Sequence, residues 1–434
     1  MRYRTLLSWK LFFVLLFAAG LHAQEIAGTW QGTVDVGQKL RVIVQIDKAD
    51  GGIKGQIYSI DQTPHPKPLT KIAYADTKLA FSVDAYHASY EGTLSPDGKT
   101  ITGTMTQGVP KPLVFERAVG ENAWAIPASP HTAQMIAVDK EVKLEVLDYG
   151  GTGRPLVLLT GLGDDAHVFD KFAPKLSGTY HVYGVTRRGF GDSSKPEFVT
   201  ANYTVAHLGE DVLAVIDNLH LVRPIVAGHS IAGEELSYIG NEHPDKIAGL
   251  IYIDAGYPYA IYDTEQGSFL IDALDLREQL NHALPGGTPP DDMKKTLDGL
   301  IASLKLVERE VIEQRAAMED MPPPPGPRSP APPVGTAIMT GQQRFTKINA
   351  PALFIYASPH DLGQMMKDNP KARAAMEARD KITTERQIAA VKREVPEAHV
   401  VVIPNANHYL FRTNEADVLR EMNNFIATLP ATAK

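Results

Sequence analysis

A serine, an aspartate and a histidine each follow an apolar run that reads as a buried strand. Ser230 comes shortly after the run 224–227, Asp361 after 351–357, and His408 after 399–404. A serine hydroxyl is a weak nucleophile at neutral pH, so it needs a histidine base, and that base needs a carboxylate to orient it. In this chemistry Ser230 attacks a carbonyl carbon, His408 takes and returns the proton, and Asp361 orients His408.

The residues around Ser230 favour a sharp turn from a strand into a helix. Gly228 lies two positions before the serine and Ala232 two positions after it, and helical spacing begins at Glu234. Small neighbours leave room for a serine held at positive φ on a nucleophile turn. The pentapeptide alone is also compatible with an ordinary turn, but the three residues together favour a catalytic triad.

The turn and the chain order Ser, Asp, His resemble the α/β-hydrolase fold family over about residues 136–434. The resemblance implies an α/β fold with a doubly wound, mostly parallel sheet and a helical cap insertion at about 256–350. The segment 158–163 is similar to the family's oxyanion loop, which implies an oxyanion hole formed by the backbone N–H groups of Leu162 and Ile231. The segment 185–193 is similar to a structural motif of the family, with Thr186 where aspartate is usual.

Two aspartates compete for the third place in the triad. Asp254 ends the apolar run 250–253, and Asp361 follows a later run. The family usually draws its acid from the later strand, so the resemblance favours Asp361, whose loop is expected to adjoin that of His408. Asp254 is then expected to hold the entrance to the cap.

The segment 161–166 also fits the dinucleotide fingerprint G-x-G-x-x-A, and Arg187 and Arg188 end the next strand, as a 2′-phosphate site would require. That fingerprint normally follows the first strand of its domain, whereas here another strand, 142–149, precedes it. The sequence therefore favours the hydrolase over an oxidoreductase.

Strands and helices alternate over residues 134–434, as in a doubly wound sheet. Residues 24–118 instead show short runs of alternating apolar and polar residues, separated by glycine-rich turns, which predicts a small all-β sandwich or barrel-like domain. This domain is similar to one found ahead of some exported bacterial hydrolases. Residues 119–133, with Pro127 and Pro130, are expected to form a linker.

Residues 1–23 have the features of a signal peptide: a basic start, an apolar stretch and a small residue at Ala23. We expect cleavage after Ala23 and a periplasmic or secreted protein without stable membrane insertion. A membrane anchor is the alternative, although the apolar run is too short to span a bilayer comfortably.

Composition excludes several other functions. The net charge is −8, and loss of the three positive charges of residues 1–23 takes it to −11, which argues against binding nucleic acid through phosphates. The chain has no cysteine, and hence no disulfide and no thiolate metal site. It also lacks an H-E-x-x-H helix and a P-loop, so neither a metal nor a cofactor is expected.

These observations predict an exported serine hydrolase that acts on a small molecule, most simply a carboxylic ester through an acyl-enzyme. A proline-iminopeptidase-like peptidase, a C–C hydrolase and a cofactor-free haloperoxidase could use the same triad, and a binding protein with a degenerate hydrolase fold is the non-enzymatic alternative.

Several residues near the predicted triad have more than one interpretation. Glu234 or Glu235 could bind the amine of a peptide, or could stabilise the start of their helix. His229 and His360 are interpreted as structural or supporting residues. Tyr257, Tyr259 and Tyr262 are interpreted as residues of the substrate pocket or of the contact between cap and core.

Overall fold

The computed structural model describes residues 26–35, 39–61, 65–84, 88–107, 109–284, 292–318, 333–363 and 369–430. The chain divides into two compact units, the first ending at Pro130 and the second beginning at His131. The predicted signal peptide, residues 1–23, lies outside the described residues. None of the helices in the described ranges is long and apolar enough to cross a membrane.

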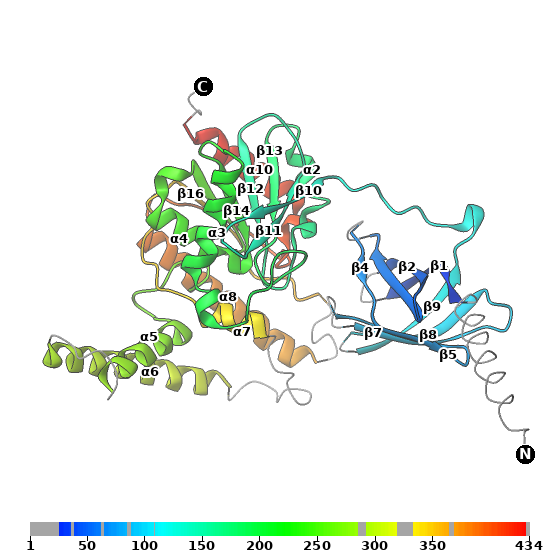
Figure 1. Ribbon diagram of the computed structural model, residues 1–434. Coiled ribbons are helices and arrows are strands. Elements are labelled where there is room, and N and C mark those ends of the chain that lie inside the picture. The colour runs from blue at the N-terminus through cyan, green and yellow to red at the C-terminus, as the bar shows by residue number, and fades with distance from the viewer. Residues whose placement is uncertain are drawn as a thin grey trace, which may run out of the picture. The chain divides into compact units, whose positions relative to one another are not determined.

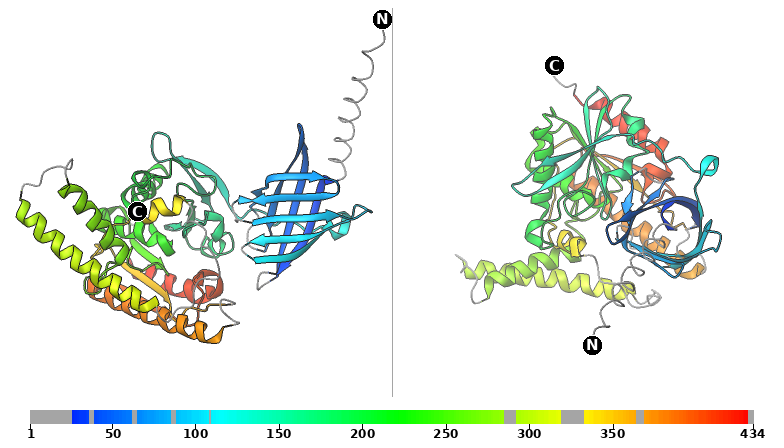
Figure 2. Two further views of the ribbon diagram at one scale, coloured as in Figure 1. Left: turned by 90° about the horizontal axis from the view of Figure 1, so that it is seen from below. Right: turned by 45° about the vertical axis from the view of Figure 1, so that its right-hand side comes forward.

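The first unit is a curved, antiparallel sheet with the strand order β4-β3-β2-β1-β9-β8-β7-β6-β5 (Figure 2). One face of each strand is buried, because apolar and polar side chains alternate along it. The fully buried Trp30, Tyr90 and Phe115 lie at the centre of this core. Its strands are β1 Gly28–Asp35, β2 Lys39–Ala49, β3 Gly52–Ser59, β4 Lys67–Pro68, β5 Thr70–Ala75, β6 Lys78–Val83, β7 Ala88–Leu94, β8 Thr100–Gln107 and β9 Val109–Arg117.

The second unit contains an eight-stranded mixed sheet with the order β10-β11-β13-β12-β14-β15-β16-β17. The first two strands pair antiparallel, and the remaining six run parallel to one another. The central strands are apolar throughout because helices cover both faces of the sheet. The strands are β10 Thr132–Ala137, β11 Lys143–Asp148, β12 Pro155–Leu159, β13 His181–Val185, β14 Ile225–His229, β15 Gly249–Ile253, β16 Ala352–Ala357 and β17 His399–Ile403.

Two buried clusters fill the two sides of this sheet. One packs Phe172 and Phe411 against the strands, and the other packs Leu236 and Val391 against the opposite face. The predicted fold class is confirmed: an α/β-hydrolase fold is preceded by an all-antiparallel β region. The helices around the sheet are α2 Ala173–Leu176, α3 Val205–Asn218, α4 Gly233–Glu242, α8 Pro370–Glu394, α9 Leu410–Thr413 and α10 Glu415–Thr428.

Three further helices lie in the described part of the segment between β15 and β16, where the sequence predicted a cap. They are α5 Phe269–Ala283, α6 Met293–Met318 and α7 Pro333–Met339. Helices α5 and α6 lie side by side (Figure 1). Helix α7 packs Val334 and Ile338 against Ile231, the residue after the candidate nucleophile. The insertion therefore brings apolar side chains next to the predicted site.

The register of the parallel strands brings their carboxyl ends to one edge. Leu159 pairs with Gly228, His229 with Ile253, and Ile253 in turn with Ile355. The loops that follow these strands therefore emerge side by side, which is how separate segments of a parallel sheet build one site.

Candidate functional site: a Ser, His and Asp cluster at the sheet edge

Ser230 lies on a strained turn between β14 and α4. Its φ is +55°, in the left-handed region that non-glycine residues rarely adopt. The turn is tight because a Cβ on Gly233 would lie 2.0 Å from the carbonyl oxygen of Ala255, and a Cβ on Gly228 would lie 2.8 Å from the Cβ of Ala232. Such strain persists where the surrounding structure enforces it, often at functional sites.

Asp254 and His408 form a hydrogen-bonded pair at the same edge. The Asp254 carboxylate, the first residue after β15, has its Oδ2 2.6 Å from Nδ1 of His408. The aspartate is fully buried, whereas 40 % of the His408 side chain is exposed. Burial alone would raise the pKa of Asp254, but hydrogen bonds from His360 and His408 outweigh it and lower that pKa to about 2. Asp254 is therefore an anion that orients the ring of His408.

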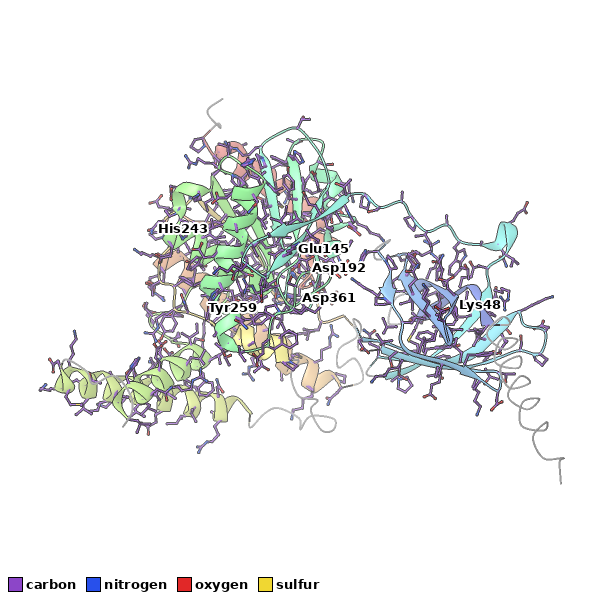
Figure 3. All side chains as sticks on the ribbon, viewed as in Figure 1. Lys48, Glu145, Asp192, His243, Tyr259 and Asp361 are labelled. Atoms are coloured by element: carbon purple, nitrogen blue, oxygen red, sulfur yellow. The ribbon has the colours of Figure 1, made fainter. Side chains whose placement is uncertain are left out.

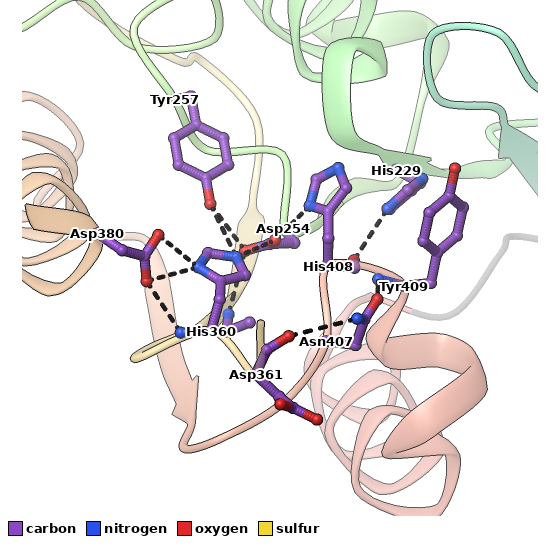
Figure 4. Close-up of polar contacts among 10 residues, drawn as sticks. His229, Asp254, Tyr257, His360, Asp361, Asp380, Asn407, His408 and Tyr409 are labelled. Atoms are coloured by element: carbon purple, nitrogen blue, oxygen red, sulfur yellow. Dashed lines mark hydrogen bonds and ion pairs between the residues drawn. The ribbon is translucent and has the colours of Figure 1, made fainter. Parts of the chain in front are cut away.

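The structure corrects the expected partner of His408, because Asp361 does not contact it. The carboxylate of Asp361 accepts a hydrogen bond from the backbone N–H of Gly363 at 2.8 Å. Its side chain is 54 % exposed and lies 4.0 Å from Arg373. Figure 4 shows Asp361 turned away from the ring of His408, although the Asp361 backbone N–H donates to the carbonyl of Ala406 in the neighbouring loop. The loops adjoin as predicted, but Asp361 directs its side chain outward.

His360, the residue before Asp361, directs its side chain towards Asp254. Its Nε2 lies 2.7 Å from Oδ2 of Asp254, and its Nδ1 lies 2.9 Å from Oδ1 of Asp380 on α8 (Figure 4). Burial opposes the charged ring, but its hydrogen bonds to both carboxylates prevail and raise the pKa of His360 to about 9. Both ring nitrogens face carboxylate oxygens, so the ring is an imidazolium at neutral pH. The sequence pattern led to the interpretation of His360 as a structural or supporting residue, and no pattern pointed to Asp380.

His229 supports the base from the other side. Its Nε2 donates a hydrogen bond of 3.0 Å to the backbone carbonyl of His408, and the two rings lie 4.6 Å apart. Burial and the neighbouring His408 lower the pKa of His229 to about 3, so this ring is neutral. His229 thus fixes the loop that carries His408 without adding charge to the site.

The two predicted oxyanion donors lie on two different segments, and one of them, Ile231, directly follows Ser230. Ile231 is in the first turn of the helix that starts at Ser230, where backbone N–H groups have no acceptor within the helix. Leu162 lies in the loop after β12 and is 41 % exposed. A Cβ on Gly161, its neighbour, would lie 2.8 Å from Nδ1 of His229, so this loop closely approaches the end of β14 that precedes Ser230.

A buried ion pair between Arg187 and Glu235 supports the loop that carries Leu162. The Arg187 guanidinium contacts Oε1 of Glu235 at 2.5 Å and donates to the carbonyls of Thr160 and Gly161 at 3.0 and 3.3 Å. Arg187 is therefore a structural support of the oxyanion loop and is not free for a 2′-phosphate. Glu235 is occupied by Arg187, and burial raises the pKa of Glu234 well above its usual range, so neither glutamate is a free anion for a substrate amine.

Tyr259, labelled in Figure 3, contacts the hydroxyl of Ser230. Burial raises the pKa of Tyr259 well above 10, while a contact with the Ser230 hydroxyl lowers it. Among the described residues no hydrogen bond joins Ser230 to His408. Tyr259 packs against a buried cluster that includes Ile231, the residue after Ser230, so the wall beside Ser230 is mostly apolar.

A family model matches the part of the chain that carries the site. The family model for the alpha/beta hydrolase fold matches residues 154–415, more than half of the chain. The chain therefore belongs to the α/β-hydrolase fold family.

Individual relatives carry several enzyme names. The fluoroacetate dehalogenase of Burkholderia sp is 30% identical over 116 residues, which is 26% of this chain and 38% of that protein. The 2-(acetamidomethylene)succinate hydrolase of Mesorhizobium japonicum is 24% identical over 277 residues, 64% of this chain and 89% of that protein. The crystal structure of E-2-(acetamidomethylene)succinate hydrolase is 22% identical, with a TM-score of 0.43 over 69% of this chain and 100% of that one. The family and these enzyme names support a hydrolase without selecting the bond that it cleaves.

Proposed function

We propose that the protein is a serine hydrolase that cleaves a carboxylic ester through an acyl-enzyme, with Ser230, His408 and Asp254 as its triad. The observation that carries the proposal is the strained Ser230 turn at the same sheet edge as the 2.6 Å Asp254–His408 pair. A carboxylate held on Nδ1 leaves Nε2 of the neutral histidine as the base, which is the arrangement that nucleophilic catalysis by serine requires.

The reaction divides into two halves. The Ser230 hydroxyl turns from Tyr259 towards His408, gives its proton to Nε2, and its Oγ bonds to the carbonyl carbon of the ester. The N–H groups of Leu162 and Ile231 stabilise the negative oxygen of the tetrahedral intermediate. His408 then protonates the leaving alcohol as the C–O bond breaks, and a water molecule repeats the sequence to release the acid and restore Ser230.

The apolar wall favours an ester with an apolar acyl or alcohol group. Ile231, Val334 and Ile338 are buried beside the nucleophile, and Leu162 lies near the same helix, 3.8 Å from a Cβ built on Gly335. The pairing of Glu235 with Arg187 speaks against an amine clamp. An ester is therefore preferred over a peptide with a free amino terminus.

Export remains part of this proposal. The features of residues 1–23 support cleavage after Ala23 and a periplasmic or secreted enzyme. Intact mass of the protein recovered from the periplasm tests this: a chain beginning at Gln24 agrees, whereas a chain retaining residues 1–23 in the membrane fraction contradicts it.

The activity is tested with p-nitrophenyl esters of increasing acyl length, alongside aminoacyl anilides. We expect ester hydrolysis, and covalent labelling of Ser230 by an organophosphonate that disappears in Ser230→Ala. Hydrolysis of anilides alone, or full ester hydrolysis by Ser230→Ala, would contradict the proposal. Circular dichroism of the variant controls for folding.

A further inference from the structure

A second group of imidazole and carboxylate side chains is buried in the hydrolase unit and takes no part in the proposed chemistry. It consists of His131, at the start of the unit, His167 in the short helix 166–169, and Asp170 directly after it. The side chains of the three residues are 6 %, 2 % and 1 % exposed. Burial of this many polar groups is costly unless each of them is satisfied.

The three side chains converge on one point. Nε2 of His131 lies 3.2 Å from Nδ1 of His167 and 3.3 Å from Oδ1 of Asp170. Nδ1 of His167 lies 3.4 Å from Oδ2 of Asp170. The two nitrogen–oxygen distances are longer than the usual range of an N–H···O hydrogen bond, about 2.7–3.2 Å.

They match the spacing of ligands around a tetrahedral metal ion. Zinc binds histidine nitrogen and carboxylate oxygen at about 2.0–2.2 Å, which places two ligands of a tetrahedron about 3.3 Å apart. We propose that His131, His167 and Asp170 form a binding site for a zinc-class divalent cation. A fourth position remains for water or for the second oxygen of Asp170.

The surrounding residues orient these ligands in the way that metal sites require. The second ring nitrogen of His167, Nε2, lies 3.3 Å from Oε1 of Glu145. Oε2 of Glu145 in turn accepts a hydrogen bond of 2.6 Å from the Thr186 hydroxyl, and Tyr149 donates one of 2.9 Å to Oδ1 of Asp170. A carboxylate behind a ligating histidine fixes its tautomer and raises its basicity. Glu145, labelled in Figure 3, would supply that support here.

The chemistry of the three proposed ligands indicates which ions would bind and what role the ion would have. Two imidazoles and one carboxylate suit zinc and its first-row neighbours, whereas calcium and magnesium prefer oxygen ligands only. The charges of Asp170 and Glu145 would balance a divalent cation. The ion would tie His131, where the chain enters the unit, to the helix that follows the oxyanion loop, so its role would be structural.

Zinc binding is tested by calorimetric titration of the full chain, stripped with a chelator and freed of affinity-tag histidines. We expect saturable binding of one equivalent of Zn²⁺ and a melting temperature that rises with Zn²⁺ concentration. Co²⁺ substitution is expected to give the visible absorption of a tetrahedral site. Absence of saturable Zn²⁺ binding would overturn the proposal.

Substitutions of the proposed ligands test where the ion binds. His131→Gln and Asp170→Asn are each expected to weaken Zn²⁺ binding at least about tenfold, on the scale of lost coordination contacts. His243→Gln, at an exposed histidine paired with Glu210, is the matched control and should bind as the wild type does. Asp254→Asn should also retain binding, since loss in that variant would assign the ion to the cluster of Asp254, His360 and His408. If Asp170→Asn does not fold, His131→Gln decides, and unchanged binding in that variant contradicts the site.

Discussion

The ends of β15 and β16 are neighbours in the sheet, yet they present their carboxylates in opposite ways. Asp254 follows β15 directly at a φ of +48°, and its carboxylate is fully buried against His408 and His360. Asp361 lies four residues after β16, and its side chain is 54 % exposed. Sheet topology brings both loops to the site, but the local backbone decides which carboxylate reaches the base.

The same comparison explains why His360 points inward. His360 precedes Asp361 and receives the contact with Asp254, while its other nitrogen and its backbone N–H are held by Asp380. The inner end of the loop thus places a cation beside Asp254. Asp254 is shared between His408, the proposed base, and the imidazolium of His360, which holds the carboxylate in place.

The largest expected effect separates the two aspartates. Asp254→Asn should lower kcat by about 10³ to 10⁴, because an amide can favour the wrong tautomer of His408 and cannot stabilise its charged form. Asp361→Asn, the matched control, should stay within about twofold, since surface substitutions of this kind are nearly neutral. Steady-state kinetics on one p-nitrophenyl ester gives both numbers, and a crippled Asp361→Asn beside an active Asp254→Asn would reverse the assignment.

Breaking a buried ion pair should lower the free energy of unfolding more than breaking an exposed one. Arg187→Met leaves Glu235 as an uncompensated buried charge and should destabilise the unit by about 3–5 kcal/mol. Arg373→Met removes an exposed partner of Glu377 and should cost at most about 1 kcal/mol. Urea denaturation measures both free energies of unfolding, and equal losses would contradict the support role of Arg187.

His360→Gln should change how stability depends on pH. The pKa of His360 is raised from 6.5 to about 9, so its stabilisation is complete below about pH 6.5 and is lost as the pH rises to about 9. The loss amounts to about 3 kcal/mol, at 1.36 kcal/mol per pKa unit. The difference in unfolding free energy between wild type and variant should therefore shrink over that range. A difference that does not vary with pH would mean that His360 is not charged in the folded protein.

The smallest effect is expected from the first unit, which carries none of the proposed catalytic residues. A chain beginning at Ser129 should keep kcat on a small soluble ester within about threefold, since the proposed triad and oxyanion donors all lie in the second unit. Circular dichroism checks that it folds. A folded but inactive chain would show that the β-domain contributes to the site.

The sequence predicted the sheet because its central strands are short apolar runs, and it predicted the Ser230 turn because small residues surround that serine. It placed His408 correctly at the sheet edge, and it recognised Asp254 as a competitor for the role of acid. It favoured Asp361 because the family usually draws its acid from the later strand, and a position after a strand does not show which way the side chain points. It missed Asp380 because that residue lies on a long, mostly exposed helix, where an acidic side chain carries no distinguishing pattern.

The central claim is that Ser230, His408 and Asp254 work as one triad. A crystal structure of the protein inhibited by an organophosphonate tests it most directly. The account predicts phosphorus bonded to Oγ of Ser230, a phosphoryl oxygen about 2.7–3.1 Å from the N–H groups of Leu162 and Ile231, and Nδ1 of His408 still bonded to Asp254. An adduct on another residue, or a His408 ring turned to Asp361, would contradict it.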